Sequence, residues 1–169
     1  HIRELKKWMD KTKLKLSNLK CGVHNPLDNL STEKLFLSGN KPLQLHNNCA
    51  GKHLAMLTAC KLNKFSINDY LSFDHPHQVN IRSVFSKFTE EKIFLKNYGV
   101  DGCSAPQYSF KIKQLGKALS NLHKSYNSEF EYSFNAKIMI DSILKNPLFI
   151  GGSKNLDSNL IKISNGSIF

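Results

Sequence analysis

Residues 46–56 read His-Asn-Asn-Cys-Ala-Gly-Lys-His-Leu-Ala-Met, and residues 99–106 read Gly-Val-Asp-Gly-Cys-Ser-Ala-Pro. Two thiols, an amine and a carboxylate therefore stand in glycine-containing stretches where the packing of a core does not require them. Cys49 and Lys52 are three residues apart at the expected start of a helix, where residues i and i+3 share a face. The field of a helix N-terminus also lowers the pKa of a thiol. These two stretches are the candidate functional part of the chain.

Cys49, Lys52 and Cys103 are candidate ligands for one metal ion. Two thiolates and one nitrogen leave a tetrahedral zinc ion with one open position, as in zinc sites that bind water or a substrate. A lysine ligand must lose its proton, which the charge of the metal can enforce. Spacing alone favours the alternative, in which both cysteines are small buried residues and Lys52 lies on the surface.

The composition is that of an ordinary globular protein, with 169 residues of which 40% are hydrophobic and 22% charged. This length predicts a single domain over residues 1–169. The net charge is +11, but only Arg3 and Arg82 among the 24 basic residues are arginine. Because arginine is the preferred group for phosphates and base edges, we expect a solvated lysine-rich surface and no nucleic-acid partner. The apolar runs are far too short for a membrane span, so no membrane partner is expected.

The four cysteines, Cys21, Cys49, Cys60 and Cys103, are too few and too irregularly spaced for a disulfide framework. This pattern favours a reducing, cytoplasmic setting. Cys60 is expected in the core, because it lies within an apolar helix face. Cys21 and His24 are interpreted as a structural pair.

Hydrophobic spacing predicts a mostly helical chain of the α+β class. Helices are predicted over residues 3–13, 32–37, 51–64, 114–126, 134–145 and 157–163, and over a segment that begins near Asp74 and Pro76. The buried face of that segment is predicted to consist of Val79, Val84, Phe85 and Phe88. Residues 92–98 are β-branched and aromatic in character and predict a short strand or extended arm that leads into residues 99–106.

The two opening stretches, together with Cys21-Gly22-Val23-His24, resemble the asparaginase II family of the rhizobial type. Residues 75–78 (His-Pro-His-Gln) and 151–152 (Gly-Gly) follow in the family's order, and the resemblance runs from end to end. Over residues 47–56 the family usually reads Asn-Asn-Cys-Ser-Gly-Lys-His-Ala-Gly-Met. The chain departs from this pattern at Ala50, Leu54 and Ala55, and none of these positions is an expected ligand.

The resemblance implies an amidohydrolase that converts L-asparagine to L-aspartate and ammonia, on a fold related to the serine β-lactamases and glutaminases. It also implies that zinc binds near the active site to Cys49, Lys52 and Cys103. Asp101 and, less strongly, His53 are implied to lie next to these ligands and to orient them. Such a metal can orient the substrate without generating the nucleophile. The resemblance leaves open a preference for glutamine and the oligomeric state, with a homodimer as one alternative.

In this resemblance the catalytic serines and lysines of the family fall outside residues 1–169. A Ser-x-x-Lys pair lies upstream, a second serine lies just before His1, and a lysine lies just beyond Phe169. We therefore expect an internal fragment, the central part of the domain, with no catalytic residue of its own and no activity alone. The alternatives are a non-catalytic zinc-binding module from a decayed or split gene and a basic nucleic-acid binder. Four internal Ser-x-x-Lys pairs are interpreted as chance matches: Ser17-Lys20, Ser31-Lys34, Ser38-Lys41 and Ser142-Lys145.

Overall fold

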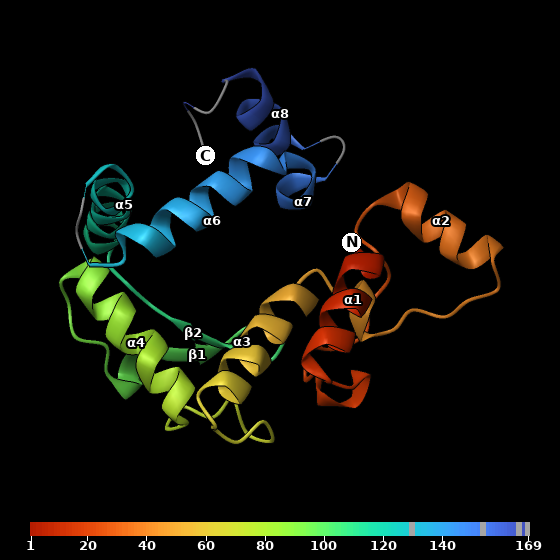
Figure 1. Cartoon of the computed structure of the whole chain (residues 1–169), viewed down its shortest axis with the longest axis horizontal. Helices are drawn as coiled ribbons and strands as arrows, with labels where there is room; N and C mark the ends of the chain where they lie inside the picture. The colour runs from red at the N-terminus through yellow and green to blue at the C-terminus, as the bar shows by residue number, and fades with distance from the viewer. Residues whose placement is uncertain (129–130, 153–154, 165–166, 168–169) are drawn as a thin grey trace. The chain divides into compact units, whose positions relative to one another are not determined.

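The computed structural model describes residues 1–128, 131–152, 155–164 and 167, and most of them are helical (Figure 1). The α-helices are α1 (Ile2–Thr12), α2 (Asn29–Leu37), α3 (Ala50–Leu62), α4 (Pro76–Thr89), α5 (Ile112–Asn127), α6 (Ser133–Lys145), α7 (Pro147–Gly151) and α8 (Leu156–Ile163). Two strands, β1 (Tyr98–Val100) and β2 (Pro106–Tyr108), form the sheet. The α+β prediction is thus confirmed, and every predicted helix is present.

The chain divides into two compact units. The first unit comprises residues 1–87 and 91–110, and the second comprises residues 88–90 and 111–169. The single domain over residues 1–169 stays a prediction.

The core of the first unit forms where α1 packs against α3. Leu5 on α1 and Leu54 and Leu57 on α3 are all buried in one apolar cluster. The helical period places Leu54 and Leu57 on one face, which is the face turned toward α1. At the edge of this contact the indole Nε1 of Trp8 donates a hydrogen bond of 3.0 Å to Thr58 Oγ1. The two helices are thereby held in a fixed register.

The two strands make a short antiparallel hairpin in the first unit. Tyr98 lies opposite Tyr108, and Val100 lies opposite Pro106. Residues 101–105 form the connection between them, so the sheet sets the place of the second sequence stretch. The predicted extended arm over residues 92–98 is only partly right, because a 3-10 turn precedes β1 and the strand starts at Tyr98.

The predicted buried face of α4 is wrong for three of its four members, Val79, Val84 and Phe85, which are 46%, 37% and 41% exposed. The polar residue Gln78 is buried instead. Its Nε2 donates a hydrogen bond of 2.9 Å to the carbonyl of Tyr70. A buried amide that finds such an acceptor can face the core, and a pattern built on hydrophobicity alone does not detect this.

The second unit consists of α5 to α8. Ile140 on α6 and Ile161 on α8 are buried. The hydroxyl of Ser158 donates to the Pro147 carbonyl at 2.7 Å and accepts from the Gly151 N–H at 3.1 Å, and so joins α7 to α8. A Cβ at Gly151 would lie 2.9 Å from Ser158 Oγ, which explains why glycine ends α7.

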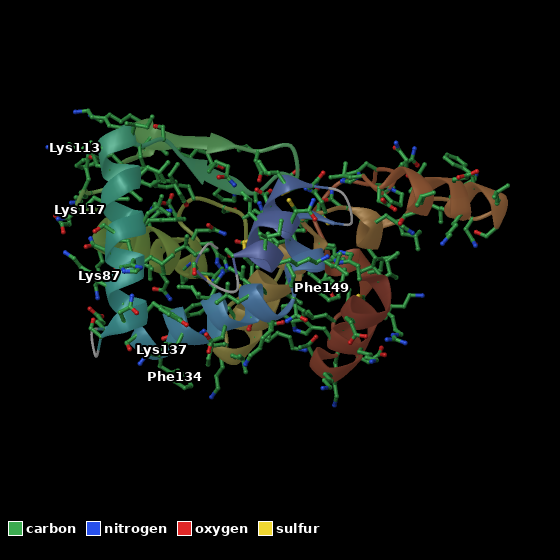
Figure 2. All side chains as sticks on the ribbon, turned by 90° about the horizontal axis from the view of Figure 1, so that it is seen from above. Lys87, Lys113, Lys117, Phe134, Lys137 and Phe149 are labelled. Carbon is green, nitrogen blue, oxygen red and sulfur yellow. The ribbon has the colours of Figure 1, made fainter. Side chains whose placement is uncertain are left out.

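Lysines stand on helices of both units. Figure 2 labels Lys87 on α4, Lys113 and Lys117 on α5, and Lys137 on α6. Lys117 pairs with Glu90 at 3.1 Å within the second unit. The positive charge of the chain is therefore spread over several helices. Across the described ranges, no helix has the length and apolar character needed to cross a membrane.

Candidate functional site

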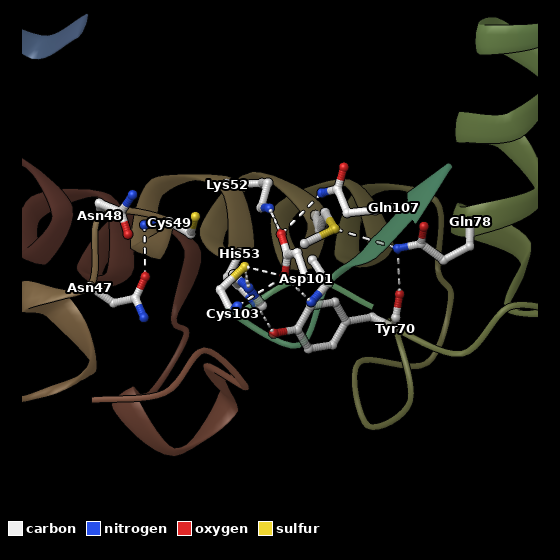
Figure 3. Close-up of polar contacts among 12 residues, drawn as sticks. Asn47, Asn48, Cys49, Lys52, His53, Tyr70, Gln78, Asp101, Cys103 and Gln107 are labelled. Atoms are coloured by element: carbon white, nitrogen blue, oxygen red, sulfur yellow. Dashed lines mark hydrogen bonds and ion pairs between the residues drawn. The ribbon is translucent and has the colours of Figure 1, made fainter. Parts of the chain in front are cut away.

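The first sequence stretch folds into the start of α3, and Asn47 holds that start in place. The N–H of Cys49 donates to Asn47 Oδ1 at 2.8 Å, and Asn47 Nδ2 donates to the carbonyl of Gly22, also at 2.8 Å. Asn47 is buried, so these bonds are shielded from water. They tie the segment around Gly22 to α3, and Figure 3 shows the bond between Asn47 and Cys49. Cys49 then occupies the cap position of α3, with Lys52 and His53 in its first turn.

The second stretch folds around the carboxylate of Asp101. Oδ1 accepts hydrogen bonds from the N–H groups of Cys103 and Ala105 at 2.9 and 2.8 Å. Oδ2 accepts from Lys52 Nζ at 2.8 Å and from Gln107 Nε2 at 3.0 Å. Aspartate commonly closes turns by bonding backbone N–H groups a few residues ahead. Asp101 therefore shapes its own loop and also joins that loop to α3 (Figure 3).

These contacts determine the charge states of Asp101 and Lys52. Burial opposes ionisation of Asp101, but its hydrogen bonds with Cys103 and Lys52 outweigh burial and hold its pKa well below the usual range. Burial likewise opposes the charge on Lys52, yet its bonds to Asp101 and Cys103 raise the pKa of this ammonium group. Without a metal, Lys52 and Asp101 are therefore a charged pair at neutral pH.

The thiol of Cys103 is buried at the point where the two stretches meet. Its Sγ lies 3.3 Å from His53 Nε2 and 3.0 Å from Asp101 Oδ1. Burial, and next the Asp101 carboxylate, raise the pKa of Cys103 to about 11. The side chains of Lys52 and Cys49 are also close enough to the thiol to influence its pKa. Burial and the nearby Lys52 charge lower the pKa of His53, so its ring is neutral at neutral pH.

The structure thus brings together all five residues singled out in the sequence: Cys49, Lys52, His53, Asp101 and Cys103. Two sulfur donors and one nitrogen donor suit zinc in chemistry and number. Among the described residues, no three His, Cys, Asp or Glu side chains are grouped as a metal would require. The candidate set therefore depends on the Lys52 amine as its third donor.

The other thiols have structural surroundings. Cys60 is buried in the core of the first unit, as predicted. Cys21 is buried too, and its thiol donates to the Gln44 carbonyl at 3.7 Å. His24 contacts the side chain of Asn48 through Nε2 at 3.3 Å. Cys21 and His24 therefore support the loop before α3, in line with the structural interpretation.

Three serines of the internal Ser-x-x-Lys pairs form hydrogen bonds with residues three or four positions earlier, in or next to the same helix. Ser31 Oγ donates to Asp28 at 2.7 Å, Ser38 Oγ to the Leu35 carbonyl at 2.7 Å, and Ser142 Oγ to the Ile138 carbonyl at 2.6 Å. Each hydroxyl proton is used locally. These bonds favour the interpretation of the pairs as chance matches.

Sequence reasoning missed three residues that support the site: Asn47, Tyr70 and Gln107. Asn47 stands inside the first stretch, and its place before the cap of α3 is a signal that could have revealed it. Gln107 directly follows the second stretch, and its contact with Asp101 depends on the unpredicted hairpin. Tyr70 has no signal in the sequence, because it approaches His53 from a loop 17 residues away.

Substituting Asp101 by asparagine should lower the free energy of unfolding of the metal-free protein by about 1–3 kcal/mol at pH 7, because charge-assisted hydrogen bonds are lost. The folded-state pKa of Asp101 lies below its unfolded value of about 3.9. Its contribution is therefore present above that pH and disappears as the pH falls. Urea titrations in chelator should show the same difference in unfolding free energy between the two proteins at pH 7 and 5, and a smaller difference at pH 3. Asp10→Asn, an exposed position of α1, is the control and should change little. A gap independent of pH would contradict the account.

Comparison with known families matches the whole chain, residues 1–169, to the family described as L-asparaginase II. A search of curated proteins found no match.

Proposed function

Because the chain belongs to the L-asparaginase II family over residues 1–169, we propose that it supplies the metal-binding part of an amidohydrolase that converts L-asparagine to L-aspartate and ammonia. The observation that carries the proposal is the meeting of Cys49, Lys52 and Cys103 beside Asp101. Packing does not require a lysine, a carboxylate and two thiols to share one point. A site for a metal near an amide substrate accounts for all of them.

Cys49, Lys52 and Cys103 are the residues that would hold zinc. Bound there, zinc supplies a Lewis acid that can orient or polarise an oxygen of the substrate. Lys52 must give up a proton from Nζ, and its side chain is 39% exposed, so that proton can leave to solvent. The bonds that Asp101 accepts from the N–H groups of Cys103 and Ala105 do not involve Lys52, so they would still shape the loop of Cys103 if Lys52 bound the metal.

The nucleophile belongs to the serine and lysine segments that the family resemblance assigns outside residues 1–169. We propose that these segments complete a fold related to the serine β-lactamases and glutaminases, of which this chain is the central part. The four cysteines are free thiols in the structure. This supports a reducing, cytoplasmic location as part of the proposal.

Ammonia release from L-asparagine should require both this chain and the serine- and lysine-bearing segments. We expect negligible turnover by the 169-residue chain alone, and turnover when it is joined to the serine- and lysine-bearing segments of an L-asparaginase II relative. In the joined protein, Cys49→Ala should lower kcat/KM by at least about 100-fold, since even residues behind a metal ligand typically matter 10–100-fold. A coupled ammonia assay with L-asparagine and L-glutamine measures both effects.

Cys60→Ala in the joined protein is the matched control, because Cys60 is a buried thiol of α3 that belongs to the core cluster. It should leave kcat/KM nearly unchanged. Turnover by the isolated chain that is lost on Cys49→Ala would contradict the proposal and place the chemistry on the metal. An inactive joined protein that binds zinc would favour the non-catalytic zinc-binding module.

A further inference from the structure

We propose that Tyr70 is a positioning residue of this site: its hydroxyl keeps His53 in the Nε2–H tautomer and so directs a hydrogen-bond donor at the Cys103 sulfur. The consequence for metal binding rests on the function proposed above. The tautomer itself is a property of the metal-free protein and can be tested separately.

The Tyr70 hydroxyl lies between one obligatory donor and one imidazole nitrogen. The backbone N–H of Lys20 is 3.0 Å from it. His53 Nδ1 is 2.6 Å from it, as Figure 3 shows. A backbone N–H can only donate, so the hydroxyl oxygen accepts from Lys20 and its proton is available to Nδ1. If Nδ1 donated instead, the hydroxyl proton would have no acceptor among these neighbours. Tyr70 is fully buried, so that arrangement would be costly.

The proton of the neutral His53 ring is then on Nε2, which faces Cys103. Nε2 lies 3.3 Å from Cys103 Sγ, and both side chains are buried. The rings of His53 and Tyr70 meet edge to face, with centroids 5.8 Å apart and planes at 88°. This packing holds the imidazole in one orientation. The Nε2–H bond is therefore a fixed donor toward Cys103, whose sulfur lies 3.3 Å away and whose backbone also interacts with the ring.

A fixed donor matters because Cys103 also faces a carboxylate. Asp101 Oδ1 lies 3.0 Å from Sγ. A neutral thiol can donate to Asp101 while it accepts from His53. Once the thiol becomes a thiolate ligand, no proton remains between sulfur and carboxylate, and the His53 N–H offsets their repulsion. The other tautomer of His53 would turn a lone pair toward the sulfur and add to that repulsion.

The first test measures the tautomer directly, by long-range 1H–15N NMR of the metal-free protein with 15N-labelled histidine. We expect the wild-type His53 proton on Nε2 and a mixture of tautomers in Tyr70→Phe. Tyr98→Phe makes the same chemical change elsewhere in the first unit and should leave the His53 shifts unchanged. An Nδ1–H signal in the wild-type protein would overturn the inference, and so would an unchanged tautomer in Tyr70→Phe. The wild-type spectrum decides the question even if the variant fails to fold.

The second test asks whether Tyr70 acts through His53. Tyr70→Phe should weaken zinc binding by about 10–100-fold, the usual effect of removing a group that helps to orient a metal ligand. In a His53→Gln background the amide can donate to sulfur without help from Tyr70, so Tyr70→Phe should have no further effect. An equal loss in both backgrounds would mean that Tyr70 is only structural. A wild-type protein that shows the Nε2–H tautomer but binds no zinc would refute the proposed metal site and leave the tautomer assignment standing.

Discussion

Cys103→Ala should reduce bound zinc from about one ion per chain to nearly none, because the site loses one of its two thiolates and keeps only one thiolate and one amine. Cys103 is also the residue on which the contacts converge, since His53, Asp101, Lys52 and Cys49 all adjoin its thiol. The measurement is zinc content by elemental mass spectrometry after dialysis, with the dissociation constant from competition against a chromogenic chelator.

Two controls make this result specific to the site. Cys60→Ala removes a buried thiol of the core cluster and should retain the full zinc content. Cys103→Ser keeps nearly the same side-chain size but has a hydroxyl in place of the thiol that would bind zinc. It should therefore lose zinc as completely as Cys103→Ala. Retention of stoichiometric zinc by Cys103→Ser would contradict the ligand set, and its loss from Cys60→Ala would indicate unfolding instead.

The pH dependence of zinc uptake should follow from the same contacts. Lys52 and Cys103 both hold their protons more strongly than usual, because Lys52 pairs with Asp101 and Cys103 is buried beside that carboxylate. A metal must displace both protons, so its apparent affinity rises as the pH increases. The raised pKa values of Lys52 and Cys103 belong to the metal-free site. They are therefore compatible with Lys52 as a metal ligand.

The candidate site was largely predictable from the sequence because its residues stand in two short stretches. The i, i+3 relation of Cys49 and Lys52 depends only on the helix that carries them. Their meeting with Cys103 depends on the hairpin of β1 and β2, whose three-residue strands are too short to produce an alternating pattern. The meeting of Cys103 with Cys49 and Lys52 was instead predicted from the resemblance to a family, which the match over residues 1–169 supports.

The fold was predictable where helices have one apolar face and less so where polar groups are buried. The ranges of α3 and α6 follow hydrophobic spacing closely. The face of α4 does not, because the buried Gln78 amide bonds to a loop carbonyl that no local pattern reveals. Tyr70 was missed for the same reason. Long-range hydrogen bonds of buried polar side chains are thus the part of this structure that sequence spacing alone did not predict.

Leu57→Ala should cost about 2–5 kcal/mol of unfolding free energy, the usual cost of truncating a fully buried leucine. Leu57 is 0% exposed in the core between α1 and α3. Cys49 caps the start of the same helix and Lys52 lies in its first turn, so the substitution should also impair zinc binding without touching a ligand. Urea denaturation followed by circular dichroism measures the loss in chelator and again with zinc.

Zinc should restore part of the stability lost in Leu57→Ala, because a ligand that binds only the folded state stabilises it by about 2.7 kcal/mol at 100 times its dissociation constant. Leu62→Ala provides the matched control, since Leu62 ends the same helix and is 79% exposed. It should change the unfolding free energy by less than about 0.5 kcal/mol. Equal losses in the two variants would contradict the packing of α3, whereas a Leu57→Ala protein that zinc does not stabilise would contradict the coupling of that core to the metal centre.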